Sequence, residues 1–193
     1  MPFILLAIVA VLALWVISVY NFFVSSKTRV GASIQEIGNQ LKRQTELIPN
    51  LVSSAKGYLS HEKGIFNELT AARKSISSAV DSGNLKKMAD AGKQLADVLP
   101  KIQVVVESNP EIKGSEVVKD LMDDLRDTSD KVMYARRLLI DLTADYNVKR
   151  VTVPSNFIAS MFGFTELKGL DTPTDGDSFS VSSDEMKTPK VSL

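Results

Sequence analysis

Two stretches of this 193-residue sequence hold side chains whose types and spacing could do chemistry. The first is His61-Glu62, which begins like the zinc motif H-E-x-x-H, in which two histidines one helical turn apart bind the metal. The position of the second histidine is Ile65, and His61 is the only histidine of the chain. We therefore interpret His61 and Glu62 as a polar pair on a helix, where His61 can hydrogen-bond a carboxylate, and not as zinc ligands.

The second stretch is Ser53 to Lys56, which matches S-x-x-K, a motif whose lysine activates a serine nucleophile. Its companion motifs are incomplete, since Ser129-Asp130-Lys131 lacks the asparagine of S-D-N and Lys187-Thr188-Pro189 has proline where K-T-G has glycine. We interpret the match as chance. The chain also has no cysteine and no glycine-rich phosphate loop, so the sequence predicts a protein that is not an enzyme and that binds no metal or cofactor.

Positive and negative charges balance over the whole chain, at 23 Lys plus Arg against 23 Asp plus Glu. No stretch is basic enough for phosphate binding, which argues against nucleic acid as a partner. Five aspartates do share one helix face: Asp120, Asp123, Asp124, Asp127 and Asp130. Such a face can bind divalent cations or a basic partner, but we interpret it as a solvated surface, which is the commoner case.

Basic pairs lie at helical spacing from carboxylates. Lys42-Arg43 near Glu46, and Arg73-Lys74 near Glu68, are spaced for ion pairs on a helix or between helices. Each such pair is worth only tenths of a kcal/mol. A buried pairing of Arg73 or Arg136 with a carboxylate on a neighbouring helix would fix the register of the two helices.

The elements that must position these residues begin with an apolar N-terminal segment. Pro2 to Val24 is 23 residues without a charge, which as a helix covers the roughly 30 Å hydrocarbon core of a bilayer. A cleavable signal peptide, the alternative, would have a basic start, a shorter apolar run and a small-x-small cleavage site, and the sequence has none of these. We therefore predict an uncleaved transmembrane anchor over residues 1–26, with the membrane as the first partner.

Charged and aromatic residues predict the orientation of this segment. Tyr20 to Phe23 is suited to an aromatic belt at the membrane surface. Lys27 and Arg29 follow the segment, whereas no Lys or Arg precedes it. The positive-inside rule then predicts a single-pass membrane protein with its C-terminal bulk in the cytoplasm.

After the anchor, apolar residues recur every three or four positions: Val30, Ile34, Ile37, Leu41, Ile48, Leu51, Ala55, Tyr58, Ile65, Leu69, Ala72, Ile76 and Val80. This pattern predicts one long helix of about 75 Å in a coiled-coil-like bundle. Pro49 lies in its middle and either kinks or ends the helix. Gly83 is suited to cap its C-terminus, and Asn84 is suited to cap the N-terminus of the next helix.

A second amphipathic run extends from Leu85 to Val106 and crosses Pro100, where a bend is expected. Its β-branched end, residues 102–106, is also compatible with a strand. We favour a helix because the spacing stays in phase and no partner strand is evident.

A third run, Val118 to Tyr146, follows a break at 108–114 and has Ser115 as its N-cap candidate. A short helix beginning near Ser155 is expected to present four apolar side chains to the bundle: Phe157, Ile158, Met161 and Phe162.

The predicted fold class is all-α, with a single N-terminal transmembrane helix followed by an elongated antiparallel bundle of three long helices and a short C-terminal helix. The bundle occupies residues 27–170, and the polar tail, 171–193, is expected to be disordered. If Val30 to Ile48 continues from the anchor, its apolar face has too few partners within one chain, which predicts a membrane-tethered homo-oligomer. Alternatively, a kink at Pro49 folds this part back onto the bundle.

One stretch, Gln40 to Arg73, carries an ordered string of short motifs: a basic pair, L-I-P-N-L-V, K-G-Y, H-E and a closing A-R. This string resembles the hallmark region of the LemA family of bacterial membrane proteins. The Y-N pairs and a second A-R elsewhere in the chain extend the resemblance to Tyr20 to Phe164. The family-motif residues are Tyr20, Asn21, Leu47, Ile48, Pro49, Asn50, Leu51, Val52, Lys56, Gly57, Tyr58, His61, Glu62, Arg73, Arg136, Tyr146 and Asn147.

The resemblance implies a single N-terminal span and a long helical bundle, and it implies no established enzymatic activity. Two positions depart from the family pattern, Leu139-Ile140 in place of a further Y-N and Glu166-Leu167 in place of an aromatic ending. We expect a membrane-anchored, non-catalytic scaffold that self-associates. The alternative is an adaptor or regulatory subunit of a membrane peptidase or envelope-stress system, that is, a protein with a partner in the membrane.

Overall fold

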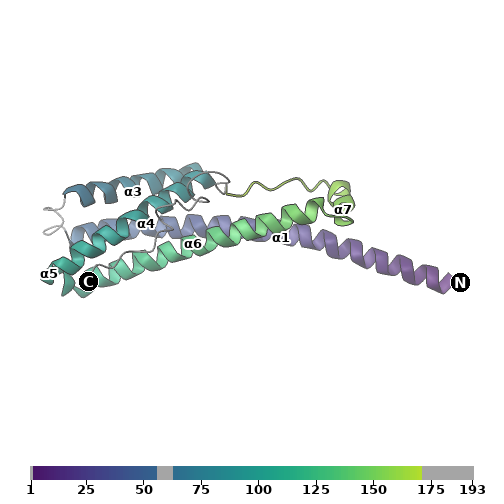
Figure 1. Cartoon of the computed structure of the whole chain (residues 1–193), viewed down its shortest axis with the longest axis horizontal. Coiled ribbons are helices and arrows are strands. Elements are labelled where there is room, and N and C mark those ends of the chain that lie inside the picture. Colours follow the sequence, from purple (N-terminus) through teal and green to yellow (C-terminus); the bar gives the residue numbers. More distant parts are fainter. Residues whose placement is uncertain (1, 56–62, 171–193) are drawn as a thin grey trace, which may run out of the picture.

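The structure is a computed structural model that describes residues 2–55 and 63–170. Its helices are α1 (Pro2–Ser54), α3 (Lys63–Ser82), α4 (Leu85–Ser108), α5 (Pro110–Lys113), α6 (Glu116–Val151) and α7 (Ser155–Met161). No strand occurs among these described residues, so the all-α class is confirmed. Figure 1 shows an elongated antiparallel bundle from one end of which the start of α1 projects alone.

The structure corrects the prediction of one helix from Val30 to Val80. Helix α1 continues through Pro49 and ends at Ser54, and α3 begins at Lys63 and runs back along α1. The bundle therefore has four long helices and not three. An apolar repeat of 3.6 residues shows which side of a helix is buried, but it stays in phase on both sides of a chain reversal and so does not locate one.

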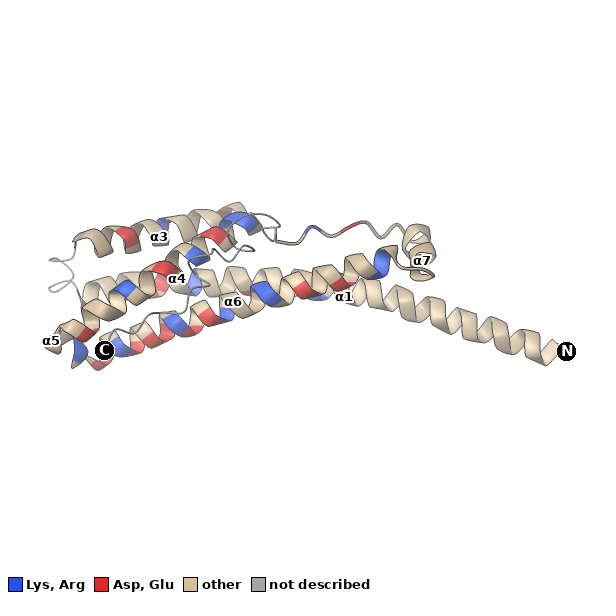
Figure 2. Ribbon diagram, viewed as in Figure 1, with Lys and Arg blue, Asp and Glu red and all other residues tan. Residues whose placement is uncertain are grey.

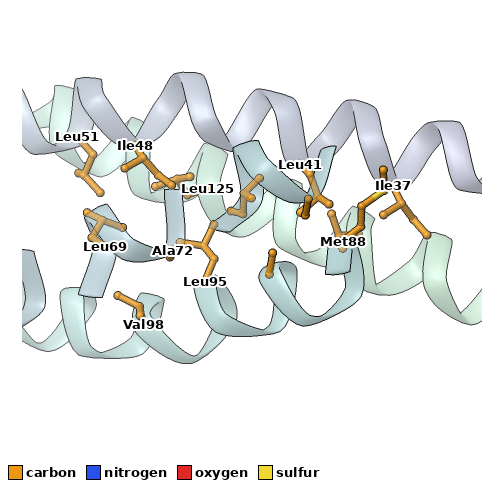
Figure 3. Packing of buried hydrophobic residues seen from close by; sticks show 14 of the residues in the cluster. Ile37, Leu41, Ile48, Leu51, Leu69, Ala72, Met88, Leu95, Val98 and Leu125 are labelled. Atoms are coloured by element: carbon orange, nitrogen blue, oxygen red, sulfur yellow. The ribbon is translucent and has the colours of Figure 1, made fainter. Parts of the chain in front are cut away.

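One main core holds α1, α3, α4 and α6 together. Figure 3 shows Ile37, Leu41 and Leu51 of α1 pointing toward side chains of the other helices. Burial of each such side chain contributes about 1.5–3 kcal/mol. Four apolar residues between positions 30 and 48 of α1 are almost fully buried: Val30, Ile37, Leu41 and Ile48. The prediction that this face lacks partners within one chain is therefore wrong, because α6 covers it.

The predicted helix ends are confirmed. Gly83 has a φ of 61°, the left-handed conformation that glycine adopts at the end of a helix. The Asn84 side chain accepts a hydrogen bond from the Lys87 amide at 3.0 Å, and the Ser115 hydroxyl accepts one from the Val118 amide at 3.4 Å. Helix α4 continues through Pro100 to Ser108, which confirms a helix at 102–106.

The C-terminal part of the bundle is arranged differently from the prediction. Helix α7 begins at Ser155 as expected, but only Ile158 of the four predicted apolar residues is buried, and Phe157 and Met161 are 67% and 64% exposed. The reason is that α7 packs with one side on α1 and leaves its other side open. Beyond α7, the chain runs back along the bundle to Leu170, and the predicted disordered tail lies outside the described residues.

A substitution at Gly92 can test how closely α4 packs against α1 and α6. A β-carbon at this position would lie 3.3 Å from Val132 and 3.4 Å from Leu41, so we expect Gly92→Leu to lower the free energy of unfolding by about 1–3 kcal/mol through overpacking. Gly38→Ala is the matched control, because its β-carbon meets no atom within 4 Å, and it should raise stability by about 0.5–1 kcal/mol. Denaturant unfolding followed by helical circular dichroism measures both, and equal effects would contradict the packing.

Candidate functional site

The structure does not assemble a catalytic or metal centre from the residues that it describes. No group of three or more Asp, Glu or His side chains is placed there to hold a metal ion. Ser53 is exposed near the end of α1, whereas Lys56, His61 and Glu62 lie outside the described residues. Burial raises the phenol pKa of Tyr146 and the nearby Arg150 charge opposes the rise, so this tyrosine is neutral at pH 7.

The aspartates of α6 lie on its outer surface, where basic residues accompany them along the helix (Figure 2). Asp124 pairs with Arg43 of α1 at 3.2 Å, and Asp127 pairs with Lys131 at 2.7 Å. The predicted partner of Arg43, Glu46, is thus replaced by a residue of another helix. Exposed pairs of this kind contribute less than about 1 kcal/mol each.

The described family-motif residues gather at two places on α1. The first, which we call the α1–α3 junction, comprises Leu47 to Val52 together with Arg73 of α3. The second, which we call the collar, lies where α1 leaves the bundle and comprises Tyr20, Tyr146, Asn147 and the aromatic residues around them. Lys56, Gly57 and Tyr58 of the motif lie outside the described residues.

At the α1–α3 junction, a side chain compensates for a missing backbone donor. Pro49 has no N–H to offer to the carbonyl of Thr45, four residues earlier in α1. The Nε of Arg73 donates a hydrogen bond to this carbonyl at 3.3 Å. The spacing predicts Glu68 as the partner of Arg73, and the structure corrects this partner to the Thr45 carbonyl. Glu68 pairs with Lys101 of α4 instead.

The apolar residues of the motif divide between core and surface at this junction. Ile48 and Leu51 are fully buried, whereas Asn50 is exposed and Leu47 is half-buried. A shallow hollow of about 400 Å³ lies on the outer side, lined mainly by Pro49, Val52, Ser53, Phe66, Thr70 and Arg73. The junction is thus a helix contact with a small open surface.

The collar is a cluster of aromatic rings between α1, α6 and the chain beyond α7. The Phe23 ring lies 5.2 Å from Tyr146 in an edge-on arrangement and stacks on Phe164 at 4.8 Å. Tyr20 meets the Phe162 ring edge-on at 4.9 Å. Aromatic pairs with these geometries add about 0.5–1.5 kcal/mol each to the effect of burial.

Asn147 of α6 binds the chain beyond α7 to the bundle. Its amide donates to the Leu167 carbonyl at 2.9 Å and its oxygen accepts from the Leu167 amide at 3.0 Å. Both backbone groups of Leu167 are thereby satisfied without a helix or strand. This bond positions the extended segment from Phe164 to Leu170 along α1 and α6.

Two further motif residues take part in neither contact. Asn21 is exposed on α1 beside the collar. Arg136 is half-buried on α6 and makes no hydrogen bond or ion pair within the described part of the chain.

Sequence reasoning missed a groove between α4 and α6. It has a volume of about 380 Å³ and its lining is largely apolar, with Leu99, Pro100, Met122 and Met133 among its residues and Arg126 and Asp130 at its polar side. The spacing of Leu99 and Met122 indicated buried faces, but the distance between two helices is not visible in a sequence.

Comparisons with known proteins show which family the chain resembles. The profile of the LemA family matches residues 33–192. The magnetosome protein MamQ of Magnetospirillum gryphiswaldense is 24% identical over 183 aligned residues, which cover 82% of this chain and 66% of that protein. Magnetosome proteins MamQ 1 and MamQ 2 of Paramagnetospirillum magneticum are similar to the same extent. The chain thus spans slightly less than two thirds of the length of these relatives.

The bond between Arg73 and Thr45 is testable by a double-mutant cycle with Pro49. Arg73→Met keeps the apolar stem and removes the donors, so we expect it to lower the free energy of unfolding by about 1 kcal/mol. In a Pro49→Ala background the effect should nearly vanish, because alanine restores the N–H that serves the Thr45 carbonyl. Denaturant unfolding measures the cycle, with Lys74→Met as the control, and equal losses in both backgrounds would refute the compensation.

Proposed function

The chain belongs to the LemA family, and we propose that it is a membrane-anchored, non-catalytic helical scaffold that assembles with further copies of itself. One observation carries this proposal. A single helix, α1, contains both a long apolar segment that the described part of the bundle leaves largely exposed and the central element of a packed rod. Such a molecule holds a rigid surface at a fixed place relative to a membrane.

The anchor is the first part of α1. This helix is long and apolar enough to cross a bilayer. The side chains of its apolar N-terminal stretch are almost all exposed. A buried core helix of a soluble protein would have this surface covered by its own chain. Figure 2 shows the projecting part of α1 without charged residues, as a span requires.

The non-catalytic part of the proposal is supported by where the described motif residues lie. Ile48, Leu51 and Tyr146 are buried, and their side chains pack helix against helix.

For self-association we propose the outer face of α6 together with the α4–α6 groove. Tyr134 and Met133 are 70% and 58% exposed on this face, and Met133 also lines the groove. Exposed aromatic and methionine side chains beside an apolar groove are typical of an interaction surface. A second copy is the occupant that we propose, because anchors hold all copies in one membrane and one orientation, which raises their effective concentration.

The chain has no cysteine, so single introduced cysteines can test this assembly. We expect full-length Tyr134→Cys protein in native membranes to form a covalent dimer with a bis-maleimide. The control is Ser78→Cys on the exposed face of α3, which packs against α1 and α4, and it should stay monomeric. Dimers from both variants, or from neither, would refute pairing through α6, and a heavier heterologous product of Tyr134→Cys would support a protein adaptor instead.

We propose that the bundle lies on the cytoplasmic side of the membrane. Lys27 and Arg29 follow the apolar segment, and Lys149 and Arg150 at the end of α6 add positive charge at the same end of the bundle.

Labelling tests the orientation with the control variant, whose cysteine lies outside the proposed interface. A membrane-impermeant maleimide should modify Ser78→Cys in inside-out vesicles and leave it unmodified in intact cells. Labelling in intact cells would place the bundle outside and contradict the positive-inside argument.

A further inference from the structure

We infer that α7 and the residues just before it lie in the headgroup region of the same membrane leaflet, as a second lipid contact beside the anchor. This inference rests on the proposed anchor and extends it to a part of the chain more than 120 residues away in the sequence. The partner is thus a lipid surface, recognised by exposed apolar side chains next to basic residues of α1 and α6.

The first argument is the level at which α7 meets α1. Ile158 and Ala159 of α7 pack with Val19 and Phe23, and with the half-buried Trp15, of α1. The last ten residues of the proposed span, 15–24, therefore run alongside α7. Since a helix of 23 residues is only slightly longer than the hydrocarbon core is thick, a bilayer that contains the span reaches the level of α7.

The second argument is the surface that α7 leaves open. Large apolar residues on α7 and just before it have between 61% and 68% of their surface exposed: Val151, Val153, Phe157 and Met161. Residues 151–165 carry no charge at all. A contiguous apolar patch of this kind is unusual on a surface that faces water and is common on one that contacts lipid.

The third argument is the charge at the upper edge of this patch. Lys149 and Arg150 are the last charged residues before α7, and the Lys149 amine lies 5.7 Å from the ring of Phe22 in α1. Lys27 and Arg29 follow on α1, while Glu166 lies 3.6 Å from Arg150 and pairs with it. Basic residues at this level match anionic headgroups, with α7 on the acyl-chain side of them.

Tryptophan fluorescence in vesicles tests this inference on the full-length protein. Trp15 is the only tryptophan, so in the native sequence it reports on the anchor alone. In a Trp15→Phe background, Phe157→Trp and, separately, Met161→Trp report on the open side of α7, where both native side chains are exposed and replaceable. Val104→Trp on the exposed side of α4, far along the bundle from the anchor, is the control.

The vesicles contain phosphatidylcholine and phosphatidylglycerol, with or without bromine on the acyl chain near the headgroup. We expect brominated lipid to remove most of the fluorescence at positions 157 and 161 and none at position 104. Quenching of Trp15 without quenching at 157 and 161 would overturn the inference and leave the anchor standing. If brominated lipid does not quench Trp15, the anchor itself is overturned. Iodide quenches tryptophans that face water. If neither iodide nor brominated lipid quenches the tryptophans at 157 and 161, protein covers α7 and the inference is overturned.

Discussion

The structure depends on one constraint, that a single unbroken helix, α1, must have one of its faces covered from Val19 to Leu51. At 1.5 Å per residue this face is about 48 Å long. Only α6, with 36 residues, is long enough to cover it, and it does so in the antiparallel direction. The α3–α4 hairpin has helices of 20 and 24 residues and reaches along only part of it. The remainder is closed by α7 and the segment to Leu170, which is why the protein has a second, aromatic core at the collar.

The two sites that carry the family motifs solve the same problem, which is a backbone group without its regular partner. At the α1–α3 junction the problem is the Thr45 carbonyl, and a guanidinium from α3 serves it. In the collar it is the extended backbone at Leu167, and the amide of Asn147 serves both of its groups. Each solution ties one element to another across the bundle, so these polar contacts set the register while burial of apolar side chains supplies most of the stability.

Residue spacing was sufficient to predict the all-α class, the buried side of the long helices and the caps at Gly83, Asn84 and Ser115, because these depend on local chemistry. It was insufficient where the answer depends on which elements meet. The reversal between α1 and α3 leaves no break in the apolar repeat, and the open side of α7 is as apolar as its buried side. The motif string indicated Pro49 and Arg73 but not their relation, since a backbone carbonyl has no signature in a sequence.

The continuity of α1 also determines what a scaffold of this shape can do. Tyr20 in the collar and Leu47 at the junction are separated by 27 residues of one helix, or about 40 Å. A flexible linker of that length would let the far end of the molecule take many positions. A packed helix pair would instead hold that end at a fixed distance from the membrane. In the assembly that we propose, copies anchored in one membrane present the outer face of α6 at the same height. A modest surface such as Met133 and Tyr134 would then be sufficient for pairing, because the anchor would determine both the orientation and the local concentration of the copies.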